Sequence, residues 1–95
     1  GKWTSYDEDG KMEEEGTYKD GKMEKQILYY ENGQKKEERN LKDGELDGKW
    51  IKYYESGKIE REINLKDGEF DGKWIDYYEN GQIKQIKHFK NGKFN

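Results

Sequence analysis

The sequence predicts an all-β fold: an elongated, single-layer antiparallel meander of stacked β-hairpin repeats, with about eight strands in about four units. Three observations support this prediction. Glycines recur at a fixed interval, each interval contains two turn dipeptides, and the segments between turns are short, lack proline and are rich in aromatic and β-branched residues.

The glycine spacing defines the repeat. Two series of glycines step by 24 residues: Gly33, Gly57 and Gly81, and then Gly44, Gly68 and Gly92. A period of this length is typical of repeat proteins, in which one unit cannot bury its apolar face alone and stacks on its neighbours. The chain then divides into a single repeat domain whose units are 1–23, 24–47, 48–71 and 72–95.

Each unit carries two turn dipeptides, 11 residues apart. The first series is Asp9-Gly10, Asn32-Gly33, Ser56-Gly57 and Asn80-Gly81, and the second is Asp20-Gly21, Asp43-Gly44, Asp67-Gly68 and Asn91-Gly92. Asn-Gly and Asp-Gly favour the two-residue type I′ turn, because both central residues of that turn need positive φ. We therefore expect tight hairpins, and for the second series the sequence leaves a wider loop open as the alternative.

A tight turn at residues 56–57 determines which strand residues face each other. The predicted pairs are Glu55–Lys58, Tyr54–Ile59 and Trp50–Ile63, and a tight turn at residues 67–68 adds Leu65–Phe70 and Lys66–Glu69. Side chains alternate along a strand, so the faces follow as well. One face is expected to carry Trp50, Lys52, Tyr54, Ile59, Arg61, Ile63 and Leu65, and the other Ile51, Tyr53, Glu60 and Glu62.

The face that carries tryptophan holds more of the large apolar side chains, so we expect it to be the structural face. Its predicted aromatic core is Trp50, Tyr54, Phe70, Trp74 and Tyr78. A single-layer sheet leaves the other face partly wet, and exposed apolar patches of this kind mark interaction sites. The predicted binding residues on that other face are Tyr29, Tyr53, Tyr77, Ile51 and Ile75.

The first unit is one residue shorter than the others. Gly21 and Gly44 are 23 residues apart, and the Gly-Lys-Trp found at 48–50 and 72–74 is replaced by Glu-Lys-Gln at 24–26. A change of one residue would reverse which face each side chain meets. We therefore predict a β-bulge or loop near residues 22–26, and a weak interface between the units at that point.

The composition restricts the classes of function. Charged residues make up 43% of the chain and hydrophobic residues 28%, a balance typical of disorder, but eight Tyr, three Trp and three Phe at regular spacing argue for a fold. The net charge is −3, with 19 basic and 22 acidic residues interleaved, so nucleic acid is excluded as a partner and an anionic membrane is disfavoured. Without cysteine the chain has no disulfide, thiolate metal ligand or thiol nucleophile.

Catalytic and metal-binding constellations are not expected. The chain has one histidine, His88, and only Ser5 and Ser56 as serines, which gives no set of nucleophile, base and orienting acid. Its carboxylates could form a glycosidase pair, but solvated charges on sheet faces explain them more simply. DGELDG at 43–48 and DGEFDG at 67–72 lack the ligand spacing of a calcium loop and are explained as turns. We predict a protein that is not an enzyme and needs no cofactor or metal.

The repeated pattern resembles the MORN repeat (membrane occupation and recognition nexus). The residues that carry the resemblance are GKWTSYDEDGKMEEEGTYKDGK at 1–22 and GKWIKYYESGKIEREINLKDGEFDG at 48–72. They are most similar to the bacterial variant, also found in antitoxin proteins of the YwqK type. The resemblance implies stacked β-hairpins in an elongated, curved sheet that serves as a binding or assembly module. The chain departs from the pattern at Asp7, where other units have a second tyrosine, and at Leu41 and Leu65, where the family often has tyrosine.

Together these observations predict a binding or assembly module that acts through a repeated aromatic surface. A protein partner ranks first, including a toxin that the chain neutralises or a second copy of the chain. Glycan or cell-wall binding is the alternative, because aromatic residues in glycine-punctuated hairpins also resemble choline-binding wall repeats, although the Gly-Trp pair of those repeats is absent. Phospholipid binding is third.

The compartment is not determined by the sequence. No segment resembles a signal peptide or a membrane span, so cytoplasmic and cell-surface or secreted locations both stay open. The chain starts at Gly1 and not at methionine, so a leader, an anchor or further repeats before it stay open too.

Overall fold

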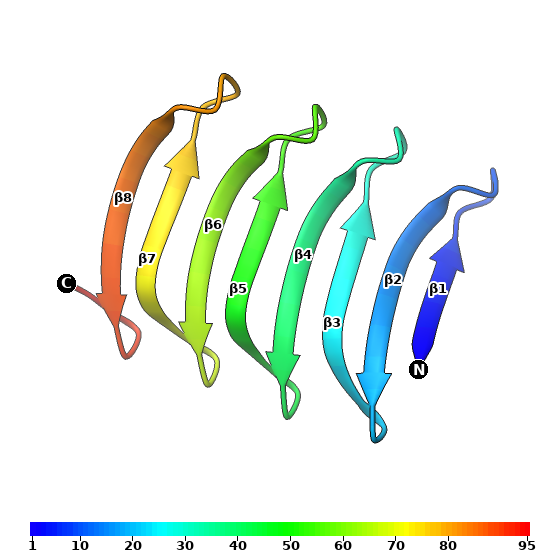
Figure 1. Cartoon of the computed structure of the whole chain (residues 1–95), viewed down its shortest axis with the longest axis horizontal. Helices are drawn as coiled ribbons and strands as arrows, with labels where there is room; N and C mark the ends of the chain where they lie inside the picture. The colour runs from blue at the N-terminus through cyan, green and yellow to red at the C-terminus, as the bar shows by residue number, and fades with distance from the viewer.

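The computed structural model describes all residues, 1–95, as one open antiparallel sheet of nine strands that follow one another in chain order (Figure 1). The strands are β1 (Lys2–Tyr6), β2 (Met12–Lys19), β3 (Lys22–Tyr29), β4 (Lys35–Lys42), β5 (Glu45–Tyr53), β6 (Ile59–Lys66), β7 (Glu69–Tyr77), β8 (Ile83–Lys90) and β9 (Lys93–Phe94). The predicted all-β meander is confirmed, with a ninth strand of two residues beyond the eight expected. The sheet measures 43 × 37 × 14 Å, so its thickness is that of one layer with its side chains.

The second turn of each unit is a tight two-residue hairpin. Its first residue has φ between 51° and 52° and its glycine has φ between 79° and 83°. Both central residues are thus left-handed, as a type I′ turn requires, and aspartate and asparagine tolerate that conformation better than most residues. Leu65 therefore lies opposite Phe70 and Lys66 opposite Glu69, as predicted.

The first turn of each unit is wider than predicted. Gly57 donates its backbone N–H to the carbonyl of Tyr54 at 2.9 Å, and Tyr54 donates its own to the carbonyl of Lys58 at 2.8 Å. Gly57 has φ of 95°, whereas Ser56 is not in the left-handed region. This is a three-residue loop made of a type I turn and a glycine bulge, not a type I′ turn. The same two bonds close the other three first turns.

The extra residue in the loop between β5 and β6 moves the side chain of Ile59 to the opposite face of the sheet. Trp50 lies opposite Ile63, as predicted, but Ile59 lies opposite Tyr53 and not opposite Tyr54. The ladder shifts by one residue just before this pair. The prediction that Ile59 shares a face with Trp50 was therefore wrong, because it assumed a two-residue turn.

A second irregularity lies in β5 and β7. In β7 the three residues 71–73 lie opposite the single residue Asn64. Gly72 has φ of 105°, and Asn64 Nδ2 donates a hydrogen bond to the carbonyl of Lys73 at 2.9 Å. The side chain thus satisfies an acceptor that the bulge displaces from the ladder. β5 repeats this arrangement around Gly48, whose φ is 95°.

β3 contains a shorter version of this bulge. Its only extra residue is Glu24, which lies between two residues that pair with adjacent residues of β2. The first unit is one residue shorter because its bulge contains one residue fewer. The side chains on either side of the bulge therefore point to the same faces as in the other units. The irregularity predicted within residues 22–26 is confirmed.

The buried core lies towards the C-terminal half of the sheet, on the face of Trp74. Ile63 is 1% exposed and Leu65 is 6% exposed. Beside them lie the rings of Phe70, Trp74 and Phe89, whose centroids are 5.1 to 5.7 Å apart. Only four of the 95 residues are buried, because nothing covers either face of the single layer.

The predicted aromatic core is only partly buried. Trp50, Tyr54, Phe70 and Trp74 are half-buried, whereas Tyr78 is 50% exposed. Tyr54 is covered because its ring reaches the next unit, where its hydroxyl donates to the carbonyl of Tyr77 at 2.6 Å. The hydroxyl of Tyr78 makes no bond of this kind, and the prediction of a core position is wrong for this residue.

We expect the substitution Gly72→Ala to lower the free energy of unfolding by about 1–3 kcal/mol. Alanine is strained at φ of 105°, and its Cβ would lie 3.3 Å from the Cβ of Asn64. Urea unfolding followed by tryptophan fluorescence measures the change. The control is Lys73→Ala at the exposed neighbour, which should shift stability by less than about 0.5 kcal/mol. Equal stability of Gly72→Ala and wild type would contradict the bulge geometry.

Candidate functional site

The two faces of the sheet are chemically different. We call the face that carries Trp50 and Trp74 the tryptophan face, and the opposite one, which carries Tyr53 and Tyr77, the tyrosine face. Residues directly opposite each other on adjacent strands share a face, so the register assigns each side chain. The predicted binding residues all lie on the tyrosine face and are half-buried: Tyr29, Tyr53, Tyr77, Ile51 and Ile75.

A row of alternating isoleucines and glutamates crosses the tyrosine face. Ile51 lies between Glu38 and Glu62, and Ile75 follows Glu62. The glutamates are 14–17% exposed, and each is bound by lysine: Lys2–Glu15 at 3.1 Å, Lys25–Glu38 at 3.7 Å, Lys35–Glu38 at 2.9 Å and Lys49–Glu62 at 2.9 Å. The hydrogen bond from Lys2 holds the pKa of Glu15 below its usual value. The carboxylates of this row are thus already paired with lysines of the chain.

The tyrosine face becomes more apolar towards the C-terminus. The residue opposite the tyrosine changes from Lys35 in β4 to Ile59 in β6 and Ile83 in β8. In the central row, Ile86 takes the position that Glu62 has one unit earlier. Ile83 is 53% exposed and Ile86 is 44% exposed. Sequence reasoning missed these isoleucines, although the loss of a charge at aligned positions of the repeat was a signal that could have found them.

The three tyrosines of this face differ in what their hydroxyls contact. Tyr29 donates its hydroxyl to Glu15 at 3.1 Å. The hydroxyls of Tyr53 and Tyr77 make no hydrogen bond within the chain. Burial raises the pKa of Tyr53, so its hydroxyl stays neutral and can both donate and accept.

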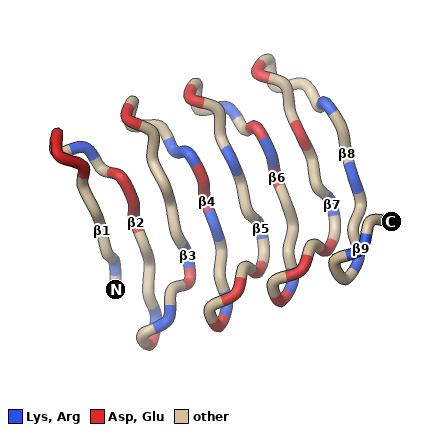
Figure 2. The backbone as a smooth tube through the Cα atoms, turned by 180° about the vertical axis from the view of Figure 1, so that it is seen from behind, with Lys and Arg blue, Asp and Glu red and all other residues tan.

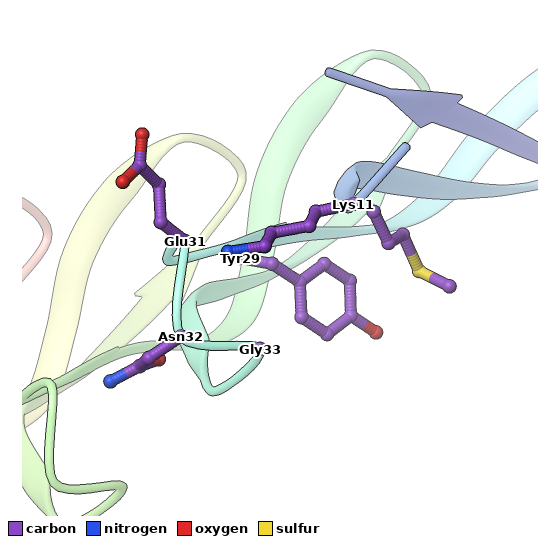
Figure 3. Close-up of a pocket in the computed structure, with 6 residues that line it drawn as sticks. Lys11, Tyr29, Glu31, Asn32 and Gly33 are labelled. Carbon is purple, nitrogen blue, oxygen red and sulfur yellow. The ribbon is translucent and has the colours of Figure 1, made fainter. Parts of the chain in front are cut away.

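A hollow of about 440 Å³ lies at the N-terminal end of the tyrosine face (Figure 3). It is lined by Lys11, Met12, Tyr29, Glu31, Asn32 and Gly33. These residues come from the loop regions of the first two units. The ring of Tyr29 and the side chain of Met12 form its apolar part, and Lys11 and Glu31 add one charge of each sign.

The tryptophan face carries a network of hydrogen-bonded charges around Asp76. This carboxylate is 5% exposed and accepts hydrogen bonds from Arg61, from Trp74 Nε1 at 3.1 Å and from Gln85 at 2.7 Å. Burial opposes ionisation of Asp76, but these hydrogen bonds outweigh it and hold the pKa of Asp76 below its usual value of 3.8.

Glu37 has the corresponding role beside Trp50. It accepts hydrogen bonds from Trp50 Nε1 at 2.7 Å and from Arg39 at 3.0 Å. Burial again opposes ionisation, and the hydrogen bonds again prevail, so the pKa of Glu37 also lies below its usual value. No buried polar side-chain atom in the chain lacks a hydrogen-bond partner.

Cations of the chain cover both of these indole rings. Arg39 and Lys52 lie 5.4 Å and 5.0 Å from the ring centroid of Trp50. Arg61 and Lys87 lie 4.9 Å and 5.4 Å from that of Trp74. The π-faces that would attract a cationic ligand are therefore already occupied.

Tyrosine hydroxyls connect one unit to the next on the tryptophan face. Tyr30 donates to the carbonyl of Tyr53 and Tyr54 donates to that of Tyr77, both at 2.6 Å. Glu60, which was expected on the tyrosine face, lies beside Tyr54 instead, because the loop bulge displaces it. These bonds tie the second hairpin to the third and the third to the fourth.

Asp7 takes the place of this tyrosine in the first unit. Its carboxylate accepts backbone hydrogen bonds from Asp9 and Lys11, both at 2.9 Å. It therefore closes its own loop and does not reach the second unit. The first interface between units lacks the hydroxyl bond that the later interfaces have.

Basic and acidic residues are interleaved along the strands, and acidic residues occur at the turns (Figure 2). No group of three or more potential metal ligands lies close together. The carboxylates of Asp47 and Asp71 instead accept the backbone N–H groups of Asp67 at 3.0 Å and of Asn91 at 3.4 Å. The structure contains no helix with the length and apolar character needed to cross a membrane.

We expect Asp76→Asn to lower the free energy of unfolding at neutral pH by roughly 1.5–3 kcal/mol, because a neutral amide cannot accept a charge-assisted bond from Arg61. The pKa of Asp76 is depressed in the folded state, so its contribution is fully present above the unfolded value of about 3.8 and is lost as the pH falls through the folded value. The stability gap between wild type and Asp76→Asn should therefore shrink in acid. Urea unfolding at neutral pH and at about pH 3 measures it.

The matched control is Asp20→Asn, which copies Asn91 at the equivalent turn position. It should change stability by less than about 0.5 kcal/mol at either pH. A gap for Asp76→Asn that stays constant in acid would contradict the assigned ion pair.

The repeat matches a known family over most of the chain. Matches to the family described as MORN repeat variant cover residues 1–20, 25–43, 46–67 and 70–91. No curated protein and no solved structure matches the chain significantly. The four matched units are the four hairpins that stack in one sheet, and MORN repeats commonly serve as binding modules and not as enzymes. The chain therefore belongs to the MORN repeat variant family.

Proposed function

We propose that the chain is a non-enzymatic binding module and that its tyrosine face binds a partner protein. The residues of the proposed site are Tyr29, Tyr53, Tyr77, Ile51 and Ile75, extended by Ile59, Ile83 and Ile86. The observation that carries the proposal is the apolar C-terminal half of this face, where Ile83 is 53% exposed and Ile86 is 44% exposed. Exposed apolar groups gathered on one face mark interaction sites in soluble proteins.

The chemistry of the face suits a protein interface. Tyr53 and Tyr77 offer large, stiff rings, and their hydroxyls have no partner within the chain, so a bound protein can satisfy them. The ion pair of Lys49 and Glu62 lies beside these rings and supplies a polar rim whose charges are already balanced. A partner would therefore bury apolar area without leaving a charged group buried and unpaired.

The repeat also constrains the shape of the partner. Tyr53 and Tyr77 occupy the same position in β5 and β7, which are separated by one strand. Adjacent strands lie about 4.8 Å apart, so equivalent side chains recur about every 10 Å. We expect the partner to present contact groups with a similar spacing.

Two other ligand classes receive less support. Choline and related cations bind the faces of aromatic rings, but cations of the chain already cover Trp50 and Trp74. Anionic phospholipid needs unpaired basic groups, whereas the lysines along the central row of the tyrosine face are paired with glutamate. Within the protein class, a toxin that the chain neutralises is the specific partner implied by the resemblance to antitoxin proteins.

A triple variant that copies charges from the first half of the chain into the second tests the proposal. Ile59→Lys and Ile83→Lys reproduce Lys35, and Ile86→Glu reproduces Glu62, so the fold should tolerate all three. Immobilised wild-type chain should retain a partner protein from its native cells that the triple variant does not retain. With that partner purified, titration calorimetry should show affinity weakened by about 2 kcal/mol or more.

Adjacent tyrosines on opposite faces provide the matched control. Tyr77→Ala should weaken binding of the same purified partner, whereas Tyr78→Ala, on the tryptophan face, should not. Far-UV circular dichroism verifies that each variant is folded. Unchanged affinity in both the triple variant and Tyr77→Ala would rule out the tyrosine face as the binding site.

A further inference from the structure

One position of the repeat alternates in charge from unit to unit. It is the third residue after the glycine of each first turn, and along the chain it is Glu13, Lys36, Glu60 and Lys84. Other charged positions keep one sign. The residue two before the same glycines is glutamate in all four units, and the residue before each second turn dipeptide is lysine in all four. We call the four alternating residues the charge stripe.

The residues of the charge stripe have equivalent places in the fold. Each is the extra residue of the β-bulge that follows a first turn, and they lie on β2, β4, β6 and β8, near the edge of the sheet that carries the first turns (Figure 1). The ammonium groups of Lys36 and Lys84 lie 5.8 Å from the ring centroids of first-turn tyrosines. Glu60 lines the hollow that contains Tyr54. Because these tyrosines belong to the tryptophan face, the charge stripe does too.

The charges of the stripe have no partner of opposite sign within the chain. None of the four residues takes part in any of the seven ion pairs of the structure. By contrast, Arg39 and Arg61 neutralise the carboxylates beside the two indole rings of this face. Glu60 is half-buried and the other three residues are exposed. The stripe is therefore free to pair with charges of another molecule.

We propose that the tryptophan face is the interface of a symmetric dimer, in which the charge stripes of two copies of this chain face each other in opposite order. A two-fold axis that lies between the sheets and parallel to the strands reverses the order of the strands and keeps the first turns at one edge. The order minus, plus, minus, plus then meets plus, minus, plus, minus. Lys36 meets Glu60 of the second copy, and Glu13 meets Lys84 of the second copy. Symmetry makes each of these pairs occur twice.

The spacing of the sheet allows all four pairs to form in one register. The stripe uses alternate strands, so its charges recur about every 10 Å in both copies. Two packed sheets cross at about 30°, which separates groups more the farther they lie from the axis. Lys36 and Glu60 lie nearest the axis, so we expect these inner pairs to contribute more than the outer ones.

The tryptophan face is large enough for a stable dimer. The sheet extends 43 × 37 Å, or about 1,600 Å² on each face, whereas a standard protein interface buries about 800 Å² on each partner. An overlap of half the face is therefore sufficient. The half-buried rings of Trp50, Tyr54 and Trp74 lie on this face, so the contact would also remove aromatic area from water. The tyrosine face would point outward on both sides of the dimer, so this interface does not rest on the proposed function.

Charge reversal within the inner pair tests the interface. Glu60→Lys copies the lysine that β4 and β8 carry at this position, and Lys36→Glu copies the glutamate of β2 and β6, so the fold should tolerate both. Through the two-fold axis, either substitution gives both inner pairs like charges. In sedimentation velocity at low salt over a range of concentrations, wild type should dimerise. Each variant should raise the dissociation constant at least about tenfold.

A mixture of the two variants gives the sharper result. Opposite charges then meet at all four contacts, so Glu60→Lys and Lys36→Glu should form a heterodimer with a dissociation constant close to that of the wild-type dimer. The double variant Lys36→Glu/Glu60→Lys should regain the wild-type dissociation constant for the same reason. Sodium chloride at about 1 M should weaken each of these dimers, because the paired charges lie near solvent.

The matched control reverses a charge on the opposite face. Lys73→Glu changes an exposed lysine of the tyrosine face and alters the net charge as much as Lys36→Glu does. It should leave the dissociation constant of the dimer unchanged. Far-UV circular dichroism verifies that every variant is folded.

A wild-type chain that stays monomeric at every concentration would overturn the proposal. Dimers that persist in both Glu60→Lys and Lys36→Glu would overturn it as well, and so would a mixture of these variants that does not associate. Dimers that Tyr77→Ala abolishes and the stripe variants retain would assign self-association to the tyrosine face instead. Partner binding by the tyrosine face depends on none of these results, so the two proposals can fail separately.

Discussion

Hydrogen bonds that pass over a strand hold successive hairpins of this sheet together. Beside the first turns, Tyr54 donates its hydroxyl to the carbonyl of Tyr77. At the second turns, at the other end of the strands, Gly68 donates its backbone N–H to the carbonyl of Leu46 at 2.9 Å. A backbone ladder joins only neighbouring strands, whereas these bonds join the second unit to the third and the third to the fourth. They matter because only four of the 95 residues are buried, so apolar burial contributes less than in a two-layer protein.

The bulges make these bonds available. A residue displaced from the ladder exposes a carbonyl or an N–H that needs another partner, and the repeat supplies that partner at equivalent positions of successive units, as Asn40 and Asn64 do. Asn64 satisfies the carbonyl of Lys73, and Asp71 accepts the N–H of Asn91 in the next turn. Asn64 in β6 and Asp71 in β7 therefore satisfy backbone groups that the bulge and the neighbouring turn leave without a ladder partner.

The same construction leaves two kinds of surface. The tryptophan face satisfies its buried charges internally, through Asp76 and Glu37, and covers its indoles with cations. The tyrosine face pairs its glutamates with lysines but keeps an apolar C-terminal half around Ile83. Partner binding is proposed for the tyrosine face, because its apolar side chains are the ones that the sheet leaves exposed.

Short-range patterns were sufficient to specify the repeat, the antiparallel meander, the pair of Trp50 with Ile63 and the bulge near Glu24, because each depends on residues close together in the chain. The face of Ile59 was not predictable, because one extra loop residue reverses the side on which a strand residue emerges. The hydrogen bonds from Tyr30 and Tyr54 to the following units depend on which strands lie side by side. Such relations are set by the stacking of whole hairpins, and they exist only in the folded sheet.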